Sequence, residues 1–147
     1  MLRWSLAALH LTALGIGLGA VWVRAGALRG PFDPAGLRRI FAADSWWGLS
    51  ALLLIGTGLW RLLGSTEKGT AYYLANHVFY TKMALLVCIL LLELWPMVTL
   101  IRWRMLVAKG GLPEAAPADT IARISYLQAL LLIGMVFAAT AMARGLG

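Results

Sequence analysis

YYLANHVFYTKMALLVCILLLELWPMVTLIRWR, residues Tyr72 to Arg104, is an apolar run that exceeds the roughly 20 residues a helix needs to cross a bilayer. Lys82 and Glu93 are its only formal charges before Arg102. Their spacing of 11 positions places them about 20° apart around a helix axis and about 16 Å apart along it. A charge near the bilayer centre costs about 2.5 to 3.5 kcal/mol, so both side chains should face a helix bundle or a wet cavity.

The rest of the chain is also too apolar for a soluble domain. Its 147 residues are 61% hydrophobic and 13% charged, with a mean hydropathy of +0.81, whereas soluble domains contain about 25% charged residues. Apolar runs at about 4–23, 46–63, 72–104 and 120–143 fill the chain with four spans and short loops. We therefore expect an all-α integral membrane protein, a four-transmembrane-helix bundle that forms a single membrane domain over residues 1–147.

The net charge of +7 comes from basic residues that flank the apolar runs, which is typical of topology signals and headgroup contacts rather than of nucleic-acid binding. Four basic residues belong to the side with the termini: Arg3, Arg61, Lys68 and Arg144. Eight belong to the opposite side: Arg24, Arg29, Arg38, Arg39, Arg102, Arg104, Lys109 and Arg123. The positive-inside rule then predicts a multi-pass membrane protein with both termini on the outer side. A cleaved signal peptide ending near Ala25-Gly26-Ala27 is the competing interpretation of the first span.

Several local signals predict where helices begin and bend. Asp33 followed by Pro34 is typical of an N-cap and a first helical turn, leading through an amphipathic stretch into the second span. Asn76 can cap near the start of the third span, and Pro96 should bend it. Asp119 or Thr120 should cap the fourth span. Five tryptophans should form a belt at the membrane interfaces: Trp46, Trp47, Trp60, Trp95 and Trp103.

Polar residues of the first and third spans define an outer level. His10 and Lys82 each lie about six residues, or roughly 9 Å, inside their spans. The helix face of His10 continues through small residues, including Gly17, to Arg24, and such a groove suits a planar macrocycle. His10 is thus a candidate haem b iron ligand, or a histidine bonded to a hydroxyl or carbonyl between helices. Lys82 can bind an anionic group such as a porphyrin propionate, move protons, or reach the headgroups; His77 should be interfacial.

A second, inner level contains Glu93, Asp44 at the mouth of the second span, and Gln128 in the fourth. Buried carboxylates need a positive partner or a proton, and Arg24 and Arg123 lie at a similar depth. Two interpretations stay open for this level. The acids can form a charge network that ties the spans together, or they can serve as a path for protons.

The segment Leu92 to Ile101, LELWPMVTLI, resembles a bacterial family of small four-span membrane proteins classed as a domain of unknown function. Together with the charge pattern, this resemblance implies a multi-pass protein of the bacterial inner membrane with both termini periplasmic. More distantly, the chain resembles the HemJ-type protoporphyrinogen IX oxidases, which are four-helix membrane haem proteins. The shared features are Ala8-Leu9-His10, Arg39-Ile40, Thr57-Gly58-Leu59-Trp60, Lys82 before leucines, and Arg123-Ile124.

The oxidase resemblance implies that His10 is the haem b ligand and that Lys82 matches that family's important lysine. The chain departs from the pattern at Tyr80, where those oxidases carry a histidine, and Glu93 has no counterpart in them. Two interpretations of these differences stay open. The chain keeps the haem-binding fold but catalyses a different reaction, or it no longer binds haem.

Three functions agree with these residues. The first is a haem b oxidoreductase in which His10, Gly17, Arg24 and Lys82 bind the cofactor and Lys82, Glu93 and Asp44 act in catalysis. The second is a proton-coupled transporter that uses Glu93 and Lys82. The third is a non-catalytic membrane scaffold. The expected partners are membrane lipid, a porphyrin ligand and a second copy of the chain, because the glycines of the first span include a GxxxG pair.

Overall fold

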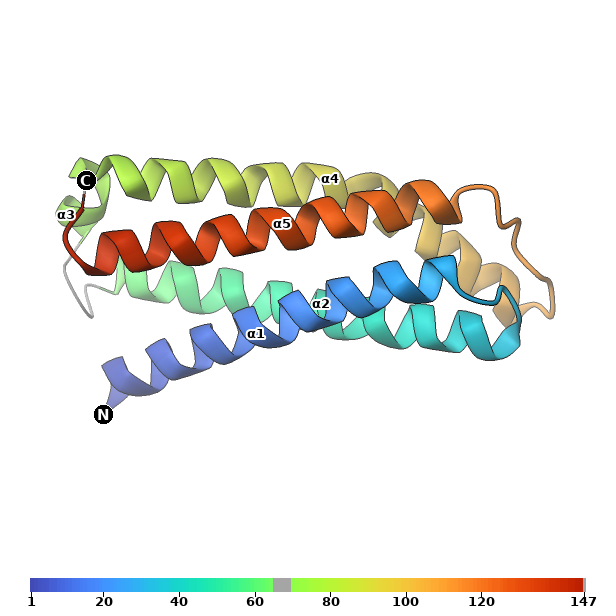
Figure 1. The fold of residues 1–147 in the computed structure, drawn as a ribbon. Helices are drawn as coiled ribbons and strands as arrows, with labels where there is room; N and C mark the ends of the chain where they lie inside the picture. The colour runs from blue at the N-terminus through green and yellow to red at the C-terminus, as the bar shows by residue number, and fades with distance from the viewer. Residues whose placement is uncertain (65–69, 147) are drawn as a thin grey trace.

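The protein is a bundle of four long helices, described by a computed structural model for residues 1–64 and 70–146. The long helices are α1 (Leu2–Arg29), α2 (Pro34–Leu63), α4 (His77–Ala108) and α5 (Ala118–Ala143), and a short helix α3 (Thr70–Ala75) precedes α4 (Figure 1). All four long helices are long and apolar enough to cross a membrane. The predicted all-α fold with four transmembrane helices is confirmed.

The bundle is closed on three sides and looser on the fourth. Helix α1 packs against both α2 and α5, and α4 packs against α5. Within the described residues, α2 and α4 share no extensive backbone contact. The two termini and α3 lie at one end of the bundle, and the α1–α2 and α4–α5 connections lie at the other (Figure 1).

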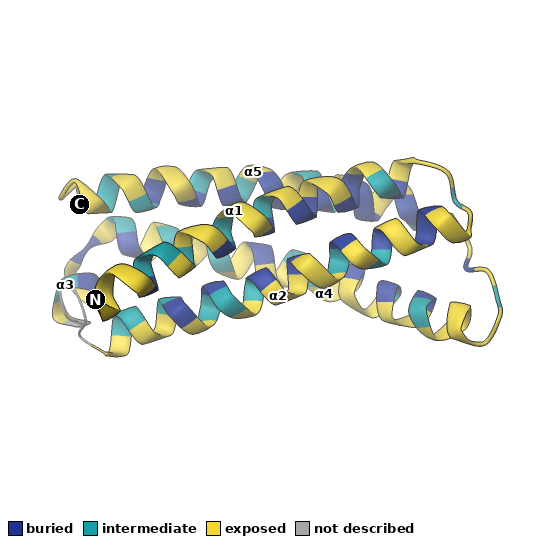
Figure 2. Cartoon of the chain, turned by 90° about the horizontal axis from the view of Figure 1, so that it is seen from below, coloured by how far each residue is buried: buried dark blue, intermediate teal, exposed yellow. Residues whose placement is uncertain are grey.

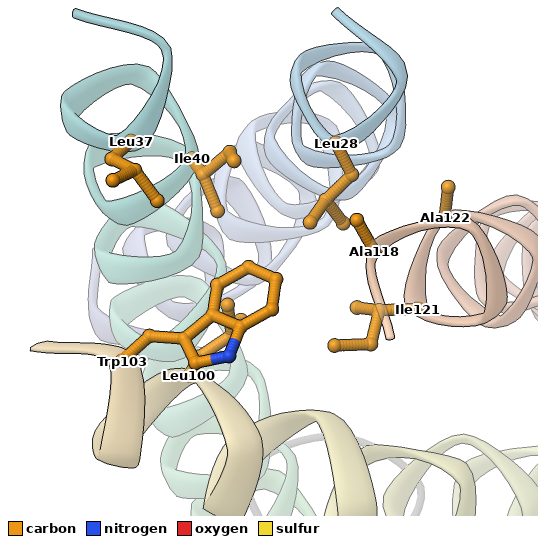
Figure 3. Packing of buried hydrophobic residues seen from close by; sticks show 8 residues of the cluster. All are labelled: Leu28, Leu37, Ile40, Leu100, Trp103, Ala118, Ile121 and Ala122. Carbon is orange, nitrogen blue, oxygen red and sulfur yellow. The ribbon is translucent and has the colours of Figure 1, made fainter. Parts of the chain in front are cut away.

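Pro96 sits inside α4 and changes how the two ends of the bundle close. Proline lacks the N–H that would bond the carbonyl four residues earlier, so it bends a helix, and α4 changes direction in its C-terminal part (Figure 1). The bend carries Leu100 and Trp103 of α4 into a core cluster with residues of the other three long helices (Figure 3): Leu28, Leu37, Ile40, Ala118, Ile121 and Ala122. The bundle is therefore tightly packed at the connection end.

Helix ends follow local side-chain chemistry in two of three predicted places. Asp33 accepts a hydrogen bond from the Gly36 N–H at 2.7 Å, and Pro34 is the first residue of α2. Asn76 interrupts the third apolar stretch and caps α4 by accepting from the Val78 N–H at 2.8 Å. The cap predicted for the fourth span is wrong, because α5 begins at Ala118 after Pro117 and has no side-chain cap.

The outward faces of the helices are apolar and exposed, as a lipid-facing surface requires (Figure 2). Trp46 and Trp60 belong to this exposed surface. The predicted tryptophan belt is wrong for two members, since Trp47 and Trp103 are only 4% and 5% exposed and belong to the core. Adjacent tryptophans in α2 thus have opposite roles, because neighbouring helix positions point about 100° apart.

Candidate functional site

Arg24 is the centre of a buried polar cluster and is 0% exposed. Its Nε donates to Ser125 Oγ at 3.0 Å, and one terminal nitrogen donates to Asp44 at 2.9 Å and to Glu93 at 2.8 Å. The other terminal nitrogen donates to Glu93 at 3.0 Å and to the Gln128 side-chain oxygen at 2.9 Å. A guanidinium has five N–H donors, so Arg24 uses its full capacity inside the protein.

Glu93 and Gln128 complete this arrangement on the side of α4 and α5. Glu93 takes both terminal nitrogens of Arg24 in the bidentate geometry that gives strong charge-assisted bonds. The Gln128 amide nitrogen donates to Glu93 at 2.9 Å and to the Ile89 carbonyl at 3.1 Å. Each acceptor faces a donor, so the network satisfies a polar set that would otherwise be costly to bury.

Asp44 connects the cluster to a second arginine. One carboxylate oxygen accepts from Arg24, and the other accepts from Arg104 at 3.1 Å. Arg104 also donates to the Phe41 carbonyl at 2.8 Å and is 37% exposed. Two arginines and two carboxylates therefore form a formally neutral group that joins α1, α2 and α4, and the bonds of Arg24 to Ser125 and Gln128 add α5.

The inner level predicted from the sequence is thus real in part. Arg24, Asp44, Glu93 and Gln128 come together as expected. The expectation for Arg123 is wrong, because its side chain is 74% exposed and pairs with Asp119 one turn earlier at 3.0 Å.

An apolar cavity of about 170 Å³ lies between α2 and α4, where these helices separate. Residues of all four long helices and of α3 line it, mostly with aliphatic and aromatic side chains, among them Trp47, Leu54, Tyr73, Phe79, Leu86 and Leu132. Its polar lining includes His10, Arg61, Lys82 and Glu93. The cavity therefore connects the two polar levels, with Lys82 and His10 on its wall and the Arg24 cluster at Glu93.

His10 is held by Thr57 of α2. The His10 Nδ1 lies 2.7 Å from Thr57 Oγ1, and that hydroxyl donates to the Leu53 carbonyl at 2.6 Å. With the hydroxyl proton directed at Leu53, Thr57 Oγ1 can accept a hydrogen bond from the Nδ1–H of His10. In a neutral ring this bond leaves the lone pair on Nε2, which is the tautomer of many metal-bound histidines.

The surroundings of the other predicted site residues are explained by helix packing, internal hydrogen bonds or exposure. A Cβ added at Gly17 would lie 3.2 Å from the Ser50 Cβ and 3.4 Å from the Trp47 ring, so α2 fills the groove that we assigned to a macrocycle. Arg24 likewise has no N–H left for a propionate. His77 is exposed and is the first residue of α4. Among residues 1–64 and 70–146, no three His, Cys, Asp or Glu side chains cluster as a metal site.

Sequence reasoning missed Thr57 and Ser125 as members of the site. Both are hydroxyl residues inside apolar helices, where each also donates to a backbone carbonyl one turn earlier. A signal existed for Ser125, which precedes Gln128 by three positions and so shares its helix face. Thr57 has no such neighbour, and its partner lies 47 positions away.

Comparisons with known proteins agree with this membrane architecture. No curated protein and no solved structure matches the chain significantly, so the resemblance to HemJ-type oxidases stays a prediction. Residues 2–147 match the family described as "Predicted membrane protein (DUF2214)". This match covers nearly the whole chain and confirms the resemblance to a four-span family of unknown function. The protein therefore belongs to this family of membrane proteins.

Proposed function

We propose that the protein is a haem b-binding oxidoreductase of the bacterial inner membrane, with His10 as the iron ligand. The observation that carries this proposal is the Thr57 hydrogen bond, which holds the His10 ring through Nδ1 at the wall of an apolar cavity. Second-layer bonds of this kind are a regular feature of metal-bound histidines.

The side chains that line the cavity suit haem, but the cavity must widen to hold it. One histidine suffices as the protein ligand of a haem iron, and apolar walls with Lys82 suit a porphyrin with its anionic propionates. A volume of about 170 Å³ is below the roughly 300 to 1,000 Å³ of ordinary ligand pockets. Helices α2 and α4 must therefore move apart to admit the group, which their lack of extensive contact permits.

The residues then have separate tasks. His10 binds the iron, Thr57 fixes the ring, and Lys82 binds an anionic group of the ligand or passes protons. Bound haem supplies one-electron chemistry, and protoporphyrinogen is the first substrate to test. Glu93 at the cavity can exchange protons with a substrate, whereas Asp44 holds the two arginines in place.

Absorption spectra of the detergent-purified protein after haem supply test this proposal. The wild type should show a Soret band whose intensity corresponds to about one haem per chain, and the His10→Ala variant should lack this band. Thr57→Val keeps the imidazole but removes its acceptor, so haem affinity should fall about 10- to 100-fold. His77→Ala is the matched control and should bind normally. A wild type that stays colourless contradicts the proposal.

A proton-coupled transporter is the second candidate, because Lys82 and Glu93 line the same cavity. Protonation of Glu93 would have to break its bidentate bond to Arg24 and its bond from Gln128. Proton-driven uptake into vesicles that is lost in Glu93→Gln, together with a colourless protein, would favour this candidate over haem chemistry.

The proposed orientation places both termini in the periplasm. Arg24 and Arg104 are paired with partly buried acids inside the bundle, so they are poor topology signals. Without them the basic residues number six on the connection side and four on the terminal side. The positive-inside rule still favours a cytoplasmic connection end, by a smaller margin than the sequence indicated.

A further inference from the structure

We propose that the lipid-facing groove between α1 and α2 binds an anionic phospholipid, with Arg39 on the phosphate and one acyl chain in the groove. This groove has a volume of about 630 Å³ and is separate from the α2–α4 cavity. Its walls consist mostly of small residues, with Ile16 at the deep end and Trp46 and Arg39 on the α2 side.

The groove is not needed for packing inside the chain. A Cβ added at Gly19 or Gly26 would meet no atom within 4 Å, in contrast to Gly17, whose lack of a side chain lets α2 approach. Both glycines are exposed and line the groove. Their missing side chains therefore leave room for something outside the bundle.

Arg39 supplies a positive charge at this groove. It is exposed and makes no hydrogen bond or ion pair with the described part of the chain. Four arginines at this end of the bundle have acidic partners, since Arg24 and Arg104 bind Asp44 and Arg29 and Arg123 bind Asp119. Arg38 and Arg102 have none among the described residues, but only Arg39 lines the groove. A phosphate is the natural partner of a guanidinium at a membrane surface.

The depth of Arg39 matches the headgroup layer. The contacts of Gly17 with Ser50 and of His10 with Thr57 set the α1–α2 register, in which paired residue numbers sum to about 67. Arg39 is then level with residue 28, which is 12 positions, or about 18 Å, from the level of Ile16. One hydrocarbon leaflet is about 15 Å thick, so the groove spans one leaflet and Arg39 reaches its polar boundary.

This length also favours a lipid over a helix of a second copy. The groove follows α1 only from Ile16 to Gly30, half of the helix. A partner helix that crosses the membrane would contact both leaflets, which takes about 20 residues. An acyl chain ends at the bilayer centre, as the groove does.

Lipid titration of the purified full-length protein, followed by native mass spectrometry, tests whether Arg39 binds the anionic headgroup. We expect wild type to bind phosphatidylglycerol more tightly than phosphatidylcholine. Arg39→Gln should lower phosphatidylglycerol affinity about fivefold, which corresponds to the contribution of one basic residue near an anionic surface. Arg38→Gln changes net charge equally at a neighbouring exposed residue outside the groove and should keep the wild-type preference. An equal loss in both variants would overturn the site.

A second pair of variants tests the groove itself. Gly26→Leu fills it with a side chain and should weaken both lipids, whereas Gly15→Leu, at an equally exposed glycine of α1 outside the groove, should not. If Gly26→Leu instead converts a dimer to a monomer and leaves lipid binding unchanged, a second copy occupies the groove and the lipid proposal is wrong.

Discussion

Arg24 shows how one side chain can organise a membrane bundle. A cation in the bilayer is tolerated when protein groups replace its hydration, and here each of its five N–H donors has an acceptor. The acceptors come from α2, α4 and α5. The residue therefore specifies which helix faces meet, and its two carboxylate partners are neutralised in the process.

Removing this cation should be costly because it leaves Glu93, a carboxylate only 18% exposed, without its partner. Arg24→Met should lower stability by about 3 to 5 kcal/mol, a drop of roughly 10 °C in the thermal midpoint for a chain of this size. The double variant Arg24→Met with Glu93→Leu should recover most of the loss, since Asp44 keeps Arg104. Thermal unfolding in detergent, followed by tryptophan fluorescence, measures both variants. A double variant as unstable as the single one would refute this explanation.

Gly17 gives a second prediction at the residue scale. Gly17→Leu places carbon atoms against Ser50 and the Trp47 ring and should cost about 1 to 3 kcal/mol through overpacking. Gly15→Leu meets no neighbour and should be neutral or slightly stabilising, because leucine favours helix more than glycine does. The same unfolding assay compares them, and equal midpoints would show that α2 can move away at no cost.

At the scale of helices, the bend of α4 separates a packed end from an open end. After Pro96 the helix brings the Trp103 ring centroid to 5.3 Å from that of Phe32 in the α1–α2 connection. It also brings Arg104 to Asp44 of α2, so side chains of α2 and α4 meet near the connections. Before Pro96 the same two helices are apart, and the cavity with His10 and Lys82 occupies that part. One proline thus determines where the bundle can hold a ligand.

Pro96→Ala should straighten α4 and move its end away from α2. Residues 97–108 of α4 follow the bend and span roughly 18 Å, so a change of about 20° displaces the end by about 6 Å. Spin labels on cysteines at Arg38 and Val107, in a Cys88→Ala background, report this distance. Met97→Ala keeps the proline and should leave the distance unchanged; an unchanged distance in Pro96→Ala as well would assign the bend to packing.

At the scale of the whole molecule, the Arg24 cluster affects how the orientation of the protein in the membrane is predicted. Arg24 and Arg104 are paired with acids, so neither counts as a topology signal. With Arg24 and Arg104 set aside, the other basic residues near the helix ends still favour a cytoplasmic connection end. Alkaline phosphatase fused after Leu146 should therefore be active, and green fluorescent protein fused there should be dark. Fusions after Lys109 should behave in the opposite way. The reversed pattern would place both termini in the cytoplasm.

The sequence by itself determined the elements of this protein. Apolar length, the Asp33 and Asn76 caps and the Pro96 bend depend on residues within one or two turns, so they could be predicted. It also indicated that Arg24, Asp44, Glu93 and Gln128 share a depth. Only the tertiary structure decided that Arg24 rather than Arg123 binds the acids, that Thr57 holds His10, and that Trp47 is buried beside an exposed Trp46. These pairings join residues up to 104 positions apart in the sequence. They depend on how each helix is rotated about its axis when it packs in the bundle, which the local sequence does not specify.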